Sequence, residues 1–282
     1  MKKISIITIN YNNAEGLLST AKSIVSLECF DNVEWIVIDG GSTDGSVEII
    51  HNYEDFISYW ISEKDEGIYH AMNKGIQAAH GEYVLFRNSG DLMSDNEVIR
   101  KFLEHPSYGV YDYCSGITEV ISNGKKLHDF YPPSDLTVEA FYRWAMPHAS
   151  TFVKLLRFKD DLYNQNMKIA ADTVFCFNDV IINNASYSPL DFKICKFDTS
   201  GISSKPENVK LCVKERDSGF QNVLPANLYK NIHYMFCNVT AAERRLIRYT
   251  WSRTWEFKVL CYVSNLISLP RRIINRLRHV KD

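Results

Sequence analysis

The stretch VEWIVIDGGSTDGSVEII, residues 33–50, joins an apolar run to a glycine- and serine-rich turn and then to an amphipathic segment. The apolar run over residues 33–39 predicts a β-strand, and the turn cluster predicts where it ends. Ser42 or Thr43 is expected to cap a helix over residues 46–53. A strand followed by a turn and a helix is the repeating unit of an α/β fold.

The same alternation continues on both sides of this stretch. Residues 3–10 read as a first strand, and residues 14–28 read as a helix with Leu17, Ala21, Ile24 and Val25 on one face. Further along, the pattern predicts a strand over 57–62, a helix over 66–81 and a strand over 82–86. This order indicates a doubly wound sheet, mixed but mainly parallel and flanked by helices, with ligands at the carboxyl ends of the strands.

The second half of the chain is less regular. Residues 109–121 and 126–131 resemble the two arms of a hairpin. The following segments read as a helix (136–145), a strand (147–154), a buried helix from about Ala170 and a late strand (189–198). Residues 207–269 look helical, with breaks at Pro225 and Pro270. We therefore expect an α/β domain over residues 1–205 and a helical C-terminal extension over residues 206–282.

Composition is that of an ordinary globular protein, with 45% hydrophobic and 23% charged residues. The seven cysteines are scattered and form no C-x-x-C pair, which indicates reduced thiols in a cytoplasmic protein and argues against a zinc site. The N-terminus has no apolar run typical of a signal peptide. Nucleic acid is not among the expected partners.

Positive charge is concentrated at the C-terminus. Residues 241–282 contain ten Lys or Arg and three Asp or Glu, a local charge of +7 in a chain whose net charge is −2. Arg alternates there with apolar residues and with Trp251 and Trp255. The segment is too interrupted to span a bilayer and suits an amphipathic helix on an anionic membrane surface, such as the inner face of the plasma membrane. Packing on the body of the protein, or an oligomer contact, is the alternative.

Polar residues follow each of the first four predicted strands: Asn10 and Tyr11, then Asp39, then Glu63, Asp65 and Glu66, and finally Asp91. Asp and Asn are common in turns, so each residue alone also fits an ordinary turn. Several carboxylates at one edge of a sheet repel one another unless a cation or a hydrogen-bonding ligand lies among them. No G-x-G-x-x-G or G-x-x-x-x-G-K-[ST] motif is present, which argues against a dinucleotide-dependent dehydrogenase or a P-loop enzyme.

Five segments together resemble the family 2 glycosyltransferases, which are inverting enzymes of the GT-A fold: SIITINYNN (5–13), EWIVIDGGSTDGSVEII (34–50), SEKDEGIYHAMNKGIQAAHGEYVLFRNSGD (62–91), MPHASTFVK (146–154) and KIAAD (168–172). The resemblance covers about the first 200 of the 282 residues. It is strongest to the bacterial branch that builds O-antigen, capsule and colanic-acid-type polysaccharides. It implies a metal-dependent hexosyltransferase that uses a nucleotide-sugar donor, with uridine as the usual base, and a glycan or lipid-linked acceptor.

The resemblance also implies roles for single residues. Tyr11 and Asp39 match positions that embrace the nucleobase, with Asp39 accepting a hydrogen bond from its N–H. Asp65 and Asn73 match positions that line the nucleotide-sugar pocket. The segment Asn88-Ser89-Gly90-Asp91 stands in the place of the D-x-D motif, with Asn88 and Ser89 on the donor and Asp91 as the ligand of a divalent metal, Mn²⁺ or Mg²⁺. Asp172 matches the catalytic base, and His148 matches a histidine near the reacting centre.

Three departures from the family pattern weaken parts of this assignment. Asn88 and Gly90 replace two acidic residues, which leaves fewer metal ligands. Thr173 stands where an aromatic residue is more usual after the base, so the acceptor contacts at this position are expected to differ from the family pattern. Asp172 also fits the N-cap of a helix, and Asp179, two turns further on, is a second candidate base.

Two other functions fit the same architecture. A nucleotidyltransferase that makes sugar nucleotides is one, although its basic, glycine-rich loop after the first strand is missing from NYNNAEG. A catalytically inactive, glycosyltransferase-like binding protein is the other, because the D-x-D motif is incomplete.

Overall fold

The computed structural model describes residues 2–122, 124–143, 146–199, 201 and 205–238. The chain divides into two compact units, residues 1–225 and 226–282. The division at residue 205 that the sequence suggests stays a prediction.

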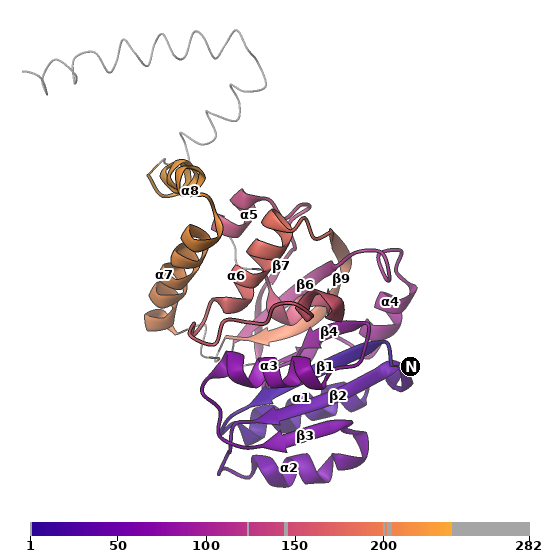
Figure 1. Cartoon of the computed structure of the whole chain (residues 1–282). Coiled ribbons are helices and arrows are strands. Elements are labelled where there is room, and N and C mark those ends of the chain that lie inside the picture. Colours follow the sequence, from indigo (N-terminus) through magenta and orange to yellow (C-terminus); the bar gives the residue numbers. More distant parts are fainter. Residues whose placement is uncertain (1, 123, 144–145, 200, 202–204, 239–282) are drawn as a thin grey trace, which may run out of the picture. The chain divides into compact units, whose positions relative to one another are not determined.

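The described part of unit 1 is built on one mixed sheet of nine strands (Figure 1). Its first half is parallel, in the order β3-β2-β1-β4. These four strands are β1 (Ile4–Asn10), β2 (Val33–Asp39), β3 (Tyr59–Ser62) and β4 (Tyr83–Phe86). All residues of β1, β2 and β4 are buried, as expected for parallel strands that are covered on both faces.

The second half of the sheet contains antiparallel pairs. Strand β8 pairs antiparallel with both β4 and β6, and β9 runs parallel to β6. The short strand β5 closes the far edge against β9, and β7 forms a hairpin with β6. These strands are β5 (Leu92–Met93), β6 (Tyr113–Ser122), β7 (Lys125–Phe130), β8 (Thr151–Lys154) and β9 (Tyr187–Asp198). The mixed sheet with flanking helices expected from the sequence is thus confirmed.

Helices cover both faces of the parallel half. Leu17 of α1 (Ala14–Val25) and Ile50 of α2 (Ser46–Asn52) join a core cluster with Trp35 and Leu85. On the other face, α3 (Ile68–Ala78) lies so close that a Cβ at Gly75 would be 2.4 Å from Ile7. The alternation of side chains along each strand therefore gives both faces an apolar surface.

The remaining helices of unit 1 are α4 (Val98–Glu104), α5 (Val138–Arg143), α6 (Ala171–Phe177), which continues as a π-helical turn over Asn178–Ile182, and α7 (Pro206–Val223). Helix α7 packs against α6, where Gly219 allows a close approach to Val174. Neither β5 nor α4 is predicted by the sequence pattern. The expected cap of the 46–53 helix is wrong, because α2 starts after Gly45 without a side-chain cap.

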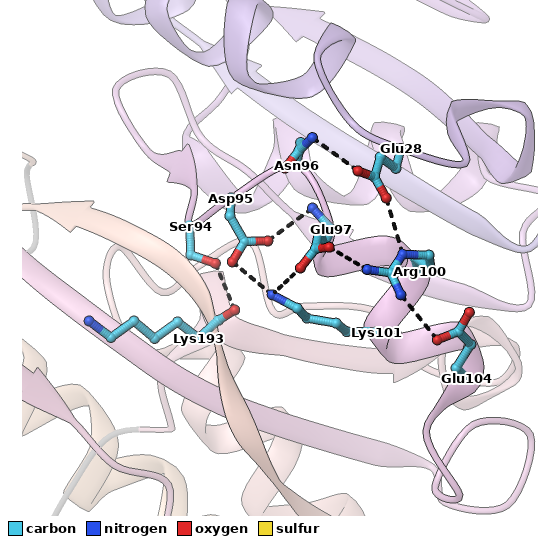
Figure 2. Close-up of polar contacts among 9 residues, drawn as sticks. All are labelled: Glu28, Ser94, Asp95, Asn96, Glu97, Arg100, Lys101, Glu104 and Lys193. Carbon is cyan, nitrogen blue, oxygen red and sulfur yellow. Dashed lines mark hydrogen bonds and ion pairs between the residues drawn. The ribbon is translucent and has the colours of Figure 1, made fainter.

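The start of α4 is fixed by a network of charged side chains (Figure 2). Arg100 contacts Glu28, which follows α1 in the chain. It also contacts Glu97, just before α4, and Glu104, the last residue of α4. Lys101 lies 3.1 Å from Asp95. These side chains are largely exposed, so the network orients the turn after β5 more than it stabilises the fold.

In unit 2, the described residues form α8 (Ala226–His233) and a π-helical turn over Tyr234–Asn238. The helical extension is confirmed over this part. The basic segment 241–282, with Trp251 and Trp255, lies outside the described residues. No helix within the described ranges has both the length and the apolar character needed to cross a membrane.

Candidate active site

Asp39, at the carboxyl end of β2, is fully buried and surrounded by hydrogen-bond donors. Its carboxylate accepts the hydroxyls of Ser42 and Ser62, both at 2.6 Å, and the Asn10 amide at 2.7 Å. It also accepts the N–H groups of Gly41 and Ser42. Burial would raise the pKa of Asp39, but the hydrogen bonds, from the Ser42 hydroxyl first, outweigh it and hold that pKa below its ordinary value. Asp39 thus organises the turn after β2 with a carboxylate already engaged inside the protein.

The side chains of Tyr11 and Asp65 both lie close to Gly40. A Cβ at Gly40 would be 3.1 Å from the Tyr11 ring and 3.5 Å from Asp65 Oδ2. Asp65 Oδ1 lies 2.8 Å from His70 Nδ1 and 2.7 Å from Lys74 Nζ. Its other oxygen, Oδ2, is buried and has no hydrogen-bond partner among the described residues. Since Tyr11 is 68% exposed, a flat ring could stack there while an N–H group on its edge reaches Asp65.

The turn after β4 presents two further polar atoms without partners. The Asn88 amide oxygen Oδ1 and the Ser89 hydroxyl are buried and bond to no other described residue. The turn itself is held by Thr20, whose hydroxyl accepts the Gly90 N–H at 3.0 Å and donates to the Asp91 carbonyl at 2.9 Å. Gly90 has φ +102°, a conformation that favours glycine. Buried polar atoms are rarely left unpaired, so these two oxygens are candidates for binding a ligand at this turn.

Asp91 is only 6% exposed, and its carboxyl lies near Arg87. Burial raises the pKa of Asp91 to about 7, and the Arg87 guanidinium acts in the opposite direction. Arg87 is itself fully buried, and its guanidinium has no hydrogen-bond partner in the described ranges. Asp91 is therefore less open to solvent than a residue in an exposed turn would be.

The oxygens of Asn88, Ser89 and Asp91 are hard ligands of the kind that Mg²⁺ and Mn²⁺ prefer. No group of three or more His, Cys, Asp or Glu suited to a metal occurs in the part of the chain that the structure describes. This ligand set fits a divalent ion only if the bound substrate supplies further oxygens.

Asp172 lies in the first turn of α6, but it does not cap the helix. Ala170 occupies the N-cap position without a side-chain hydrogen bond, so the capping alternative is wrong. The side chain of Asp172 is partly exposed, and its Oδ1 accepts the Tyr69 hydroxyl at 2.8 Å. The backbone just before it is fixed by Glu215 of α7, whose carboxylate accepts the N–H groups of residues 168, 169 and 170.

His148 lies in the same part of the molecule. Its ring stacks on Phe86 with centroids 4.4 Å apart, and Nε2 is 3.4 Å from the Tyr163 hydroxyl. Desolvation lowers the pKa of His148, although the nearby Asp172 carboxylate raises it. A neutral imidazole in this position can exchange hydrogen bonds without adding a positive charge.

Asn73 and Asp179 are both committed to structural contacts. Asn73 is buried and pairs with the backbone of Tyr163. Asp179, the second candidate base, is buried in an ion pair with Arg157 and accepts the Tyr113 hydroxyl at 2.8 Å. A carboxylate paired in this way is a poor candidate for a general base.

Apart from Asn73, the predicted residues fall into three places. Tyr11, Asp39 and Asp65 lie around the ends of β1 and β2; Asn88, Ser89 and Asp91 form the turn after β4; and Asp172 and His148 lie near each other. Sequence reasoning missed residues that support these places, among them Thr20, Ser62, Tyr69, Arg87, Tyr163 and Glu215. An open cavity of about 1000 Å³, lined by residues between 76 and 82 and between 154 and 162, contains none of the predicted residues.

Several known sequences that match this chain are glycosyltransferases. Residues 5–162 match the family model described as Glycosyl transferase family 2. An uncharacterized glycosyltransferase of Mycobacterium tuberculosis is 31% identical over 214 residues, which are 72% of this chain and 78% of that protein. A cholesterol galactosyltransferase of Borreliella burgdorferi is 37% identical over 91 residues, 32% of this chain and 25% of that protein.

Solved structures with the same fold include S. aureus TarS 1-349, with a TM-score of 0.63 and 19% identity over 83% of this chain and 72% of that chain. That protein is also known in complex with UDP and with UDP-GlcNAc. The mannosyltransferase PcManGT from Pyrobaculum calidifontis, in complex with GDP-Man and Mn²⁺, has a TM-score of 0.59 and 15% identity over 98% of this chain and 84% of that chain.

Proposed function

Because the chain belongs to glycosyl transferase family 2, we propose that it is an inverting glycosyltransferase that moves a sugar from a nucleotide-diphosphate sugar, with UDP as the favoured nucleotide, to a hydroxyl of a glycan or lipid-linked acceptor. The observation that carries this proposal is the partly exposed carboxylate of Asp172, which is held by Tyr69 and lies beside a neutral His148. Such a carboxylate suits a general base for a hydroxyl nucleophile.

In the proposed reaction, the acceptor hydroxyl attacks the anomeric carbon from the face opposite the diphosphate. The new bond joins the acceptor oxygen to that carbon, and the bond between the carbon and the diphosphate oxygen breaks. Asp172 takes the proton of the hydroxyl, and the nucleoside diphosphate leaves with the bonding electron pair. A hydroxyl is a weak nucleophile until its proton is removed, so the base supplies a large part of the rate enhancement.

The donor would bind along the carboxyl ends of β1, β2 and β4. Tyr11 stacks on the nucleobase, and Asp65 Oδ2 accepts an N–H from its edge. Asp39 supports this pocket through the turn that it organises, and Asn73 supports it through the loop at Tyr163. Asn88 and Ser89 bind the sugar or the diphosphate through their unpaired oxygens.

A divalent ion, Mn²⁺ or Mg²⁺, would be held by Asn88 and Asp91 together with oxygens of the donor diphosphate. When bound, it would neutralise the charge that develops on the leaving diphosphate. The neighbour that was solved with GDP-Man and Mn²⁺ supports a metal in this fold.

The acceptor would belong to a cell-surface polysaccharide of the O-antigen or capsule type. We place the reaction in the cytoplasm, at the inner face of the plasma membrane, where the basic segment 241–282 would contact anionic lipid. A lipid-linked acceptor would be presented at that surface.

Incubation with a panel of sugar nucleotides, with Mn²⁺, Mg²⁺ or a chelator, tests the proposal. A glycosyltransferase slowly hydrolyses its own donor and releases the nucleoside diphosphate. A nucleotidyltransferase instead releases pyrophosphate from a nucleoside triphosphate and a sugar phosphate. Donor binding without any turnover, even with a range of glycan acceptors, would identify an inactive binding protein and contradict the proposal.

A further inference from the structure

The contact between Tyr69 and Asp172 joins α3 to the start of α6 across 103 residues of sequence. We infer that Tyr69 is a positioning residue for the catalytic base, holding Asp172 Oδ1 so that Oδ2 faces the acceptor hydroxyl. This inference rests on the proposed function, because it requires Asp172 to act as the base.

Asp172 needs such a partner because the end torsion of an aspartate side chain is broad, and a carboxylate without a fixed donor samples many orientations. The backbone of residues 168–170 is anchored by Glu215 on α7. The Tyr69 hydroxyl then fixes the carboxylate itself from the side of α3. Within the described residues, no hydrogen bond from another side chain reaches Asp172 Oδ2, which leaves that oxygen available for a proton.

Tyr69 is suited to a fixed orientation. It is only 3% exposed, and its ring packs edge-on against Tyr163 with centroids 5.6 Å apart. Tyr163 is in turn held by Asn73, one turn after Tyr69 on the same helix. Helix α3 therefore fixes both the ring and the neighbour that supports it.

The hydroxyl of Tyr69 also stays a donor. Burial and then the nearby Asp172 carboxylate raise the pKa of Tyr69 far above its ordinary value, so the phenol keeps its proton around neutral pH. The phenol therefore does not give its proton to Asp172, and its O–H donates a hydrogen bond to Oδ1. A hydrogen bond to a charged group stabilises more than a neutral one, so its loss should be measurable in turnover.

The simpler explanation is that Tyr69 is a core aromatic residue whose hydroxyl happens to find an acceptor. Tyr113 provides a matched control, because it is another buried tyrosine that donates at 2.8 Å to Asp179, an aspartate other than the proposed base. Both Tyr→Phe changes remove one hydroxyl from the core. Only the change at position 69 should affect catalysis.

We expect Tyr69→Phe to lower kcat by roughly 10- to 100-fold, the loss of one hydrogen bond to a charged group, with the donor KM within about twofold of wild type. Tyr113→Phe should lower thermal stability about as much as Tyr69→Phe does, and it should leave kcat within about twofold of wild type. In an Asp172→Asn background, where the base is already lost, Tyr69→Phe should cause no further loss of turnover. A role in packing alone would lower turnover by the same factor in both backgrounds.

The outcomes separate the two proposals. If Asp172→Asn retains wild-type turnover, Asp172 is not the base and the proposed mechanism fails together with this inference. If Asp172→Asn is impaired while folded Tyr69→Phe turns over at the wild-type rate, only the inference fails. If Tyr69→Phe is too unstable to assay, 4-fluorophenylalanine at position 69 fills the space of the hydroxyl without donating, and the same loss of kcat is expected.

Discussion

The side-chain amide of Asn73 forms two hydrogen bonds with the backbone of Tyr163, 90 residues further along the chain. It donates to the carbonyl at 2.8 Å and accepts the N–H at 3.1 Å. Asn73 thus fixes the loop that carries Tyr163, next to His148 of the candidate site.

Asn73→Ala should leave both backbone groups of Tyr163 buried without partners. We expect the free energy of unfolding to fall by about 2–6 kcal/mol, because each of the two unpaired buried groups costs about 1–3 kcal/mol. Urea unfolding measures this change. Gln77→Ala, at an exposed position one turn further along α3, serves as a control and should change stability by less than about 0.5 kcal/mol. Unchanged stability with weaker donor binding would instead indicate a direct contact between Asn73 and the donor.

Asp39 should make the stability of the protein depend on pH in the acid range. Its pKa in the folded protein lies below the ordinary value, because its hydrogen bonds outweigh the effect of burial. The resulting stabilisation is fully present above the unfolded pKa of about 3.9 and is lost as the pH falls through the folded pKa. In Asp39→Asn, stability at neutral pH should be lower and its decline below about pH 4 shallower. Parallel profiles of stability against pH for the two proteins would show that the Asp39 carboxylate does not cause the pH dependence.

Arg157, which pairs with one carboxylate, should contribute more to stability than Arg100, which contacts three. Arg157 pairs with the buried Asp179, and Arg157→Met should cost about 3 kcal/mol, since it leaves a buried carboxylate without its counter-charge. Arg100 contacts three glutamates, but these side chains are 38–65% exposed. Arg100→Met should cost less than about 1 kcal/mol and even less at high salt. Thermal unfolding at two salt concentrations compares them, and equal losses would contradict the argument from burial.

The turn after β4 should bind metal only together with the donor. Asn88→Asp adds a carboxylate at a position whose oxygen has no partner, and it should lower the Mn²⁺ concentration for half-maximal donor binding by roughly tenfold. Asp91→Asn should raise that concentration. Calorimetric titration of donor at several Mn²⁺ concentrations measures both. If neither variant changes the metal dependence, this turn does not ligate the ion.

Removal of residues 241–282 tests the basic segment. Several Arg and Lys near an anionic surface contribute on the order of 1 kcal/mol each, so the shortened protein should lose most of its binding to anionic vesicles. Neutral vesicles are the control, and activity on a soluble acceptor should persist. Equal vesicle binding by both proteins would rule out this role.

Much of the fold could be predicted because its strands are apolar on both faces. β1, β2 and β4 are continuous buried runs, and α1 and α3 have a regular apolar stripe. β5 could not be predicted, because two residues carry no periodicity and the strand exists only through its pairing with β9.

The site was predictable in part for a different reason. The resemblance named Asp65 and Asp172 as candidates, but the contacts that give them their geometry depend on tertiary structure. Asp39 meets Asn10 and Ser62 because the parallel register places the three residues opposite one another at the strand ends. Tyr69 looks like an ordinary helix residue in the sequence until α6 packs beside it.

The position of β8 has a consequence for the newly synthesised chain. β4 receives one neighbour, β1, from the sequence before it and the other, β8, only when residues 151–154 have been made. Until then the apolar segment YVLF forms the open edge of a half-built sheet. Open apolar edges recruit strands from other chains, so during biosynthesis this is the segment where chaperone binding or aggregation should begin.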